Sequence, residues 1–285
     1  MDIEWRVESP DIPDKLPLAI LATPAYEERL HAVRTLHERF GLGDTIELDL
    51  PTGVAHASKR GEVQYFSASG AVRARDARVL DECPEWTDVS EVDGRFVLGD
   101  DTSAMLFQDA GELLRAARLL ADGLGDVDVV LDQWVRTDKS GQEIARGPGR
   151  AVVRAPYSLD GFPFIGAGAK TRLAYQPVDG HPVLTRIFHV HRPVIDVHTV
   201  HTGGTERALT GLLNDPFLAA GHDHVAVTGI EVGLLALPAV VPQRVAAPAL
   251  GVTGMIDDQP FVRYYQAISA KALRAAGFAA THVPR

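Results

Sequence analysis

The sequence contains little cysteine and little positive charge, and each shortage excludes a class of protein. Cys83 is the single cysteine in 285 residues, so the chain can form neither an intrachain disulfide nor a four-cysteine zinc site. The formal net charge is −10, which argues against general binding to nucleic acid or anionic membranes, because both attract basic surfaces. We therefore expect a small-molecule substrate or ligand as the partner, and neither nucleic acid nor a membrane.

The chain also lacks the segments that direct a protein into or across a membrane. No apolar run reaches the roughly 18–20 residues of a membrane-spanning helix, and the longest, at 225–241, contains Glu231. The first 15 residues have no basic segment followed by an apolar one, so we expect no secretion signal and a cytoplasmic location. The oligomeric state is left open.

Familiar catalytic and cofactor motifs are missing as well. There is no G-x-S-x-G elbow and no G-x-G-x-x-G after a strand, which argues against a hydrolase serine and against a dinucleotide site. The segment GAGAKT at 166–171 is similar to a phosphate loop, but Phe164 and Ala169 stand where that motif needs glycines. We therefore predict no cofactor.

The sequence contains a tetrapeptide that occurs twice. Gly-Leu-Gly-Asp occurs at 41–44 and at 123–126, each time after a helical apolar pattern and before a strand-like segment. The first pattern predicts a helix with Thr23 as N-cap and Pro24 at its first position. The second predicts a helix over 106–124. The glycines are expected to stop both helices.

Two further helices are predicted, at about 205–213 and 266–276, and the remaining sequence alternates like antiparallel strands. Turn signals stand at Ser69-Gly70, at Lys139-Ser140-Gly141 and at Asp179-Gly180. The pattern predicts an α+β fold with curved antiparallel sheets, or a barrel-like sheet, and about four helices. The repeated tetrapeptide adds the alternative that a helix-plus-hairpins unit is duplicated.

Two domain arrangements fit these elements. In the first, residues 1–95 form an N-terminal α+β subdomain that packs tightly on a C-terminal α+β subdomain of residues 96–285. In the second, the whole chain is a single domain. No low-complexity linker separates two halves, so the boundary in the first arrangement is placed near 91–101.

The segment 157–194 has an ordered series of strand and turn signals. An aromatic strand leads to Gly161-Phe162-Pro163 and a glycine-rich bend, and an Asp-Gly turn is followed by a strand that ends in Arg192-Pro193. This segment resembles the hairpin part of PepSY-type modules, which also occur in thermolysin-type propeptides. The resemblance implies a local helix-plus-hairpin fold and a role in binding or inhibition without catalysis.

Four of the eleven histidines lie within the segment 188–201, FHVHRPVIDVHTVH. In a strand, His189 and His191 share one face because side chains alternate. Asp196 precedes His198 by two residues and is placed to orient it for acid–base catalysis at neutral pH. The segment therefore predicts either an acid–base site or a metal site.

Glu231 interrupts an otherwise apolar strand. A buried carboxylate must be paired or protonated with a raised pKa, because burying the bare charge is costly. The alternatives are an ion pair with an arginine or a place on an edge that faces water. We include Glu231 in the predicted catalytic set, which consists of His189, His191, Glu231, Asp196 and His198.

Lys170 and Arg172 share a face of the strand that follows the glycine-rich bend. We predict that they bind ligand together with Tyr175, as a wall that accepts an anion. The alternative is a strand face covered by solvent.

Three functions follow. The preferred one is a cofactor-independent enzyme that uses an enclosed pocket for cyclisation, isomerisation or lyase-type chemistry. The second is a non-catalytic, PepSY-like binding or regulatory module. The third is a metal-dependent enzyme, because two histidines at i and i+2 of a strand can face one ion. Its zinc would be held by His189, His191, His198 and His201.

Overall fold

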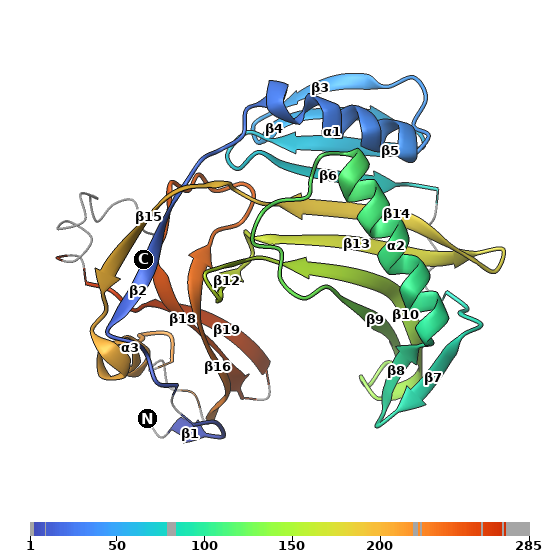
Figure 1. The fold of residues 1–285 in the computed structure, drawn as a ribbon. Coiled ribbons are helices and arrows are strands. Elements are labelled where there is room, and N and C mark those ends of the chain that lie inside the picture. Colours follow the sequence, from blue (N-terminus) through green and yellow to red (C-terminus); the bar gives the residue numbers. More distant parts are fainter. Residues whose placement is uncertain are drawn as a thin grey trace. The chain divides into compact units, whose positions relative to one another are not determined.

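The computed structural model in Figure 1 describes residues 3–8, 10–78, 84–218, 222, 224–257, 259–269 and 271, apart from the side chains of 206–208. The chain divides into two compact units, and each unit combines segments that are distant in the sequence. Unit 1 consists of residues 1–23, 157–169 and 192–285, and unit 2 consists of residues 24–156 and 170–191. The predicted boundary at residue 95 falls inside unit 2. Cys83 lies outside the described residues.

The protein is mostly β, with 53% of its residues in strands and 15% in helices. The described residues form three helices and several antiparallel sheets, none of which closes into a barrel. The predicted α+β fold with about four helices is therefore wrong, and so is its barrel-like alternative. Residue 266, the first of the predicted fourth helix, ends strand β19 (Gln259–Gln266), whose aromatic and β-branched residues favour a strand. Residues 272–276 lie outside the described part.

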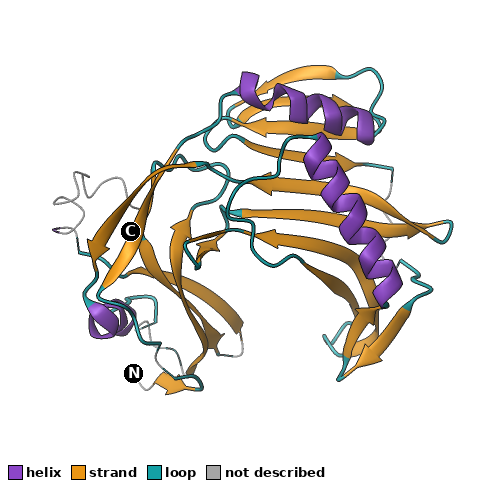
Figure 2. Ribbon diagram, in the orientation of Figure 1, coloured by secondary structure: helices purple, strands orange, loops and turns teal. Residues whose placement is uncertain are grey.

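Unit 2 contains an eight-stranded antiparallel sheet in the order β3-β4-β5-β6-β14-β13-β10-β9. Helices α1 (Tyr26–Arg39) and α2 (Asp100–Ala116) cover one face of it, as Figure 2 shows. Apolar residues of both helices and of the sheet form one buried core. The strands are β3 (Ile46–Leu50), β4 (Gly53–Ser58), β5 (Gly61–Phe66), β6 (Ala71–Asp76), β9 (Asp128–Thr137), β10 (Glu143–Pro156), β13 (Lys170–Val178) and β14 (His181–Val190), with a separate hairpin of β7 (Val89–Val92) and β8 (Arg95–Leu98).

The eight strands are two copies of one helix-plus-four-strand arrangement. Helix α1 is followed by β3 to β6, α2 is followed by β9, β10, β13 and β14, and the two copies join where β6 pairs with β14. In the first copy, strand β3 begins at Ile46, two residues after the end of Gly-Leu-Gly-Asp. In the second copy, strand β9 begins at Asp128, at the same distance from its own tetrapeptide. From there the strands pair in equivalent register, with Ile46 opposite Ala57 and Asp128 opposite Arg154, although β9–β10 and β13–β14 contain register shifts that the first copy lacks. The two tetrapeptides therefore occupy equivalent positions.

The ends of the first two helices differ from the sequence prediction. The N-cap of α1 is Ala25 rather than Thr23, and its amide donates to the Glu28 carboxylate at 2.9 Å. Helix α2 ends at Ala116, because Arg118 takes a left-handed conformation with φ of 53°. Leu120 and Leu124 consequently lie outside the helix and are exposed.

Unit 1 is built from two smaller sheets and helix α3 (Gly204–Leu213). The larger sheet has the order β11-β12-β16-β18-β19, with β1 beside β16, and the smaller has the order β15-β2-β17. The strands are β1 (Ile3–Trp5), β2 (Lys15–Leu21), β11 (Ser158–Leu159), β12 (Phe162–Gly166), β15 (Val194–His201), β16 (Val225–Ala236), β17 (Val245–Ala246) and β18 (Pro248–Ile256). No helix in the described part of the chain has the length and apolar composition that crossing a membrane requires.

Candidate functional site

The face of the eight-stranded sheet that lies opposite the helices carries many cations. Side chains alternate along each strand, so an arginine or lysine beside a buried core residue points away from the helices. Ala74, Ile187 and Leu173 are such core residues. We call the opposite side the basic face, and its cations are Arg73, Arg75, Arg150, Arg154, Lys170, Arg172 and Arg186.

The strand register places several of these cations directly opposite one another. Arg75 on β6 is paired with Arg186 on β14, and Arg172 on β13 is paired with Arg154 on β10. Directly opposed residues have Cβ atoms about 4.5–5.5 Å apart, and like charges at such positions destabilise a sheet. The repulsion between these arginines therefore destabilises the central strands of the sheet.

Carboxylates neutralise only part of the basic face. Glu62 accepts from Arg73 at 2.7 Å and lies 3.2 Å from Arg75. Asp128 forms an ion pair with Arg154. Among the described residues, no carboxylate forms an ion pair with the remaining cations, which are Arg150, Lys170, Arg172 and Arg186. A chain of net charge −10 thus carries a local excess of positive charge on this face.

The pKa values report the same excess. Desolvation lowers the pKa of Arg186, and three neighbouring arginines lower it further. These neighbours are Arg150, Arg73 and Arg75. Desolvation also lowers the pKa of half-buried Lys170, and the charge of Arg172 adds to the effect. A bound anion would favour the charged forms of all these groups.

Two aromatic rings complete the basic face. Phe188 on β14 lies between Arg73 and Arg172 in the register. Its ring centroid is 6.0 Å from that of Phe66, and the Arg73 guanidinium carbon is 5.8 Å from the Phe66 ring centroid. The face thus combines guanidinium groups with an apolar floor, which suits an anion that carries an apolar or aromatic part.

The three predicted ligand-binding residues do not all lie on this face. Lys170 and Arg172 lie on the basic face, because they alternate along β13 with buried Thr171 and Leu173. Tyr175 lies on the opposite face of β13, because strand alternation groups it with Thr171 and Leu173 in the core. There its hydroxyl donates to Asp109 of α2 at 2.9 Å, and burial beside that carboxylate raises its pKa.

Five arginines of the basic face were not identified from the sequence, namely Arg73, Arg75, Arg150, Arg154 and Arg186. A signal for Arg73 and Arg75 was present in the segment AVRARD, where arginine alternates with alanine and valine. The sequence contains no signal that these arginines lie close together, because strands β6 and β14, which bring them together, are over 100 residues apart in the chain.

The two histidines of the predicted catalytic set that belong to unit 2 lie on its helix-covered side. His189 is fully buried and shares a hydrogen bond of 2.8 Å with the Thr171 hydroxyl. The His191 ring lies 6.4 Å from that of His189. Burial lowers the pKa of His189 well below its usual value and that of His191 to about 4, and the Arg29 charge adds to both effects. Both imidazoles are therefore neutral at pH 7.

The other three members of the set, and His201, belong to unit 1. His198 lies 3.3 Å from the Asp196 carboxylate, but both side chains are exposed on β15. Glu231 is exposed on β16, and partial desolvation raises its pKa. It has no arginine partner among the described residues, which leaves the water-facing alternative.

The four predicted zinc ligands are divided in the same way, with His189 and His191 in unit 2 and the other two in unit 1. In the part of the chain that the structure describes, no three histidine, cysteine, aspartate or glutamate side chains are grouped so that they could hold a metal ion.

Comparison with known proteins supports the fold alone. No family model matches the chain, and no curated protein matches it. Among solved structures, it is similar to the crystal structure of an uncharacterized protein from Eubacterium rectale, with a TM-score of 0.54 and 8% sequence identity. The similarity covers 94% of this chain and 88% of the other, so it extends over nearly the whole of both proteins.

Proposed function

We propose that the protein binds a small organic anion on the basic face of unit 2. The observation that carries this proposal is the group of four cations without a carboxylate partner among the described residues, Arg150, Lys170, Arg172 and Arg186. Like charges gathered on neighbouring strands reduce stability, and an anionic ligand would reverse that effect.

The residue types narrow the class of ligand. Arginine outnumbers lysine on the basic face, and its planar guanidinium matches carboxylate and phosphate groups with two parallel hydrogen bonds. Several cations favour a ligand with more than one negative charge. The Phe188 ring between Arg73 and Arg172 favours a ligand with an apolar or aromatic part.

Catalysis is a separate proposal. A cofactor-independent cyclase, isomerase or lyase function is supported by the neutral imidazoles of His189 and His191, which are able to accept a proton at pH 7. They lie on the helix-covered side of β14, whereas the cations lie on the other side. A non-catalytic binding function, PepSY-like or otherwise, would require the basic face but not the two histidines.

Titration calorimetry with pyrophosphate and with citrate tests the binding proposal, at an ionic strength held constant with sodium chloride. We expect both anions to bind and Arg186→Gln or Arg172→Gln to weaken binding at least about tenfold, since a hydrogen bond to a charged group contributes about 1.5–3 kcal/mol. The matched control is Arg34→Gln, which removes an exposed charge from helix α1. The proposal is wrong if neither anion binds, or if the control weakens binding as much as Arg186→Gln does.

A further inference from the structure

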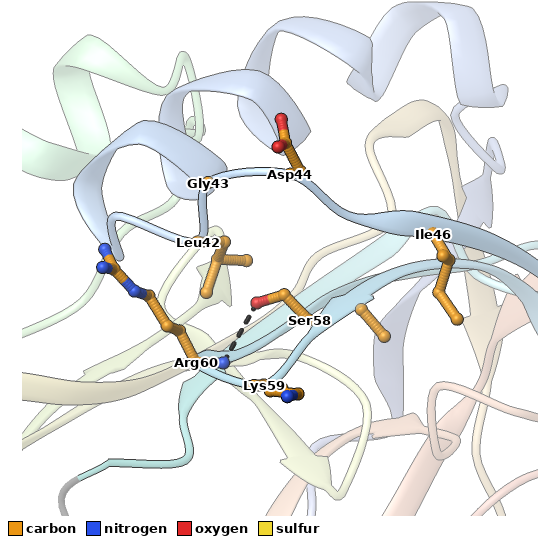
Figure 3. A pocket seen from close by; sticks show the side chains of 8 residues that line it. Leu42, Gly43, Asp44, Ile46, Ser58, Lys59 and Arg60 are labelled. Carbon is orange, nitrogen blue, oxygen red and sulfur yellow. Dashed lines mark hydrogen bonds between the residues drawn. The ribbon is translucent and has the colours of Figure 1, made fainter.

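Unit 2 has an open cleft at the start of β3. Figure 3 shows it between the first Gly-Leu-Gly-Asp loop and the turn that joins β4 to β5. Its volume is about 750 Å³, within the range of about 300–1,000 Å³ that small-molecule sites occupy. The lining residues are Leu42, Gly43, Asp44, Ile46, Ala57, Ser58, Lys59 and Arg60.

The lining is apolar on one part and cationic on another. Leu42, Ile46 and Ala57 supply the apolar part. Arg60 is held in place, because its guanidinium donates to the Gly41 carbonyl at 3.1 Å and its amide donates to the Ser58 hydroxyl at 3.1 Å. Lys59 is exposed and forms no ion pair with the described residues.

The equivalent place in the second copy of the repeat is closed. Because Ala57 and Arg154 hold the same register position, Lys59 corresponds to Pro156, and Gly43 corresponds to Gly125. The Gly125 amide donates to the Pro156 carbonyl at 2.9 Å, and the Pro156 ring lies 3.4 Å from where a Cβ of Gly125 would stand. At Gly43, no atom of the described residues lies within 4 Å of the equivalent position.

The path of the chain explains why this place is closed in the second copy and open in the first. In the second copy, β10 ends at Pro156, and residues 157–169 leave unit 2 before the chain returns as β13. In the first copy, β4 turns directly into β5 through Lys59 and Arg60, and the loop and the turn remain apart. An intrachain contact of the second copy is thus replaced by open space in the first.

We infer that this cleft binds an amphiphilic anion, a medium-chain carboxylate by class. The carboxylate group would accept from the Lys59 ammonium, and the alkyl chain would lie on Leu42, Ile46 and Ala57. Asp44 is the only carboxylate among the described residues that line the cleft, and in Figure 3 its side chain points away from Lys59, so the Lys59 end of the cleft is cationic. The site is distinct from the basic face, because none of its residues belongs to that set.

The probe is decanoate at concentrations below micelle formation, measured by calorimetry on the full chain. Decanoate should bind, whereas acetate should fail for lack of an alkyl chain and decyltrimethylammonium should fail because its charge has the wrong sign. Lys59→Gln should weaken decanoate binding up to about fivefold, as expected for an exposed ion pair. Ala57→Phe, which fills the cleft, should weaken it at least about tenfold.

The controls separate this site from the basic face. Lys139→Gln removes an exposed lysine from the β9–β10 turn and should leave decanoate affinity unchanged, and so should Arg186→Gln. Circular dichroism establishes that Ala57→Phe is folded, and Lys59→Gln provides the test if it is not. Equal binding of decyltrimethylammonium, unchanged affinity in Lys59→Gln, or loss of binding in Arg186→Gln would each overturn the inference.

Discussion

Replacement of Arg186 by glutamine should stabilise the ligand-free protein while it weakens anion binding. Arg186 is directly opposed to Arg75 across the β6–β14 pair, and the charges of Arg73 and Arg150 also act on it. A like-charge pair at opposed positions costs about 0.2–1 kcal/mol, and exposure of the guanidinium to solvent reduces each of these interactions. The net gain in the free energy of unfolding should be about 0.5–1 kcal/mol at low salt.

Urea denaturation of the wild type and of Arg186→Gln, each at low and high salt, measures this gain. The gain should shrink toward zero in about 0.5 M salt, where the Debye length falls to a few ångströms. Arg34→Gln, on helix α1, should be neutral within about 0.5 kcal/mol, as most surface substitutions are. A loss of more than about 1 kcal/mol in Arg186→Gln at both salt concentrations would refute the reasoning, because the guanidinium would then make favourable contacts that outweigh the repulsion.

Two further predictions concern the helix-covered side of unit 2. The pKa of His191 falls from 6.5 in the unfolded chain to about 4 in the folded protein, so the unfolded state binds more protons between these values. The stability that neutral His191 contributes should therefore be complete above pH 6.5 and should decline by up to about 3 kcal/mol as the pH falls toward 4. His191→Gln should make this decline smaller when the free energy of unfolding is measured by urea denaturation. An unchanged slope would show that His191 does not cause the decline. Tyr175→Phe removes the donor to Asp109 and should cost about 1–2 kcal/mol by thermal unfolding, whereas Tyr264→Phe, at an exposed position, should be nearly neutral; equal effects would mean that the hydrogen bond contributes nothing.

Some features of the fold follow from short stretches of sequence. The Asp179-Gly180 turn was predicted, and both residues take the positive φ values, 51° and 78°, that such a turn requires. The alternation around Lys170 and Arg172 places both on one strand face, as the structure shows. These features are local, because turn chemistry and side-chain alternation depend only on neighbouring residues.

Two other predictions from local sequence were wrong. Tyr175 was predicted to bind ligand with Lys170 and Arg172, but its odd spacing from both residues places it on the opposite face of β13, in the core beside Leu173. The second helix was predicted to continue to Leu124, but the left-handed conformation of Arg118 ends it at Ala116. The position of Tyr175 was thus readable from the alternation, whereas the end of the helix has no signal in the residues themselves.

By itself, the sequence determined the turns, most strands, the repeated Gly-Leu-Gly-Asp and the face on which Lys170 and Arg172 lie. Only the tertiary structure decided that β6 pairs with β14, which brings Arg73 and Arg75 beside Arg186 and turns separate arginines into one basic face. It also decided that His189 and His191 are neutral, since burial sets their pKa values. The physical reason is that alternation assigns a side chain to a face of its own strand, whereas the neighbours on that face depend on strand order and register, which long-range packing selects.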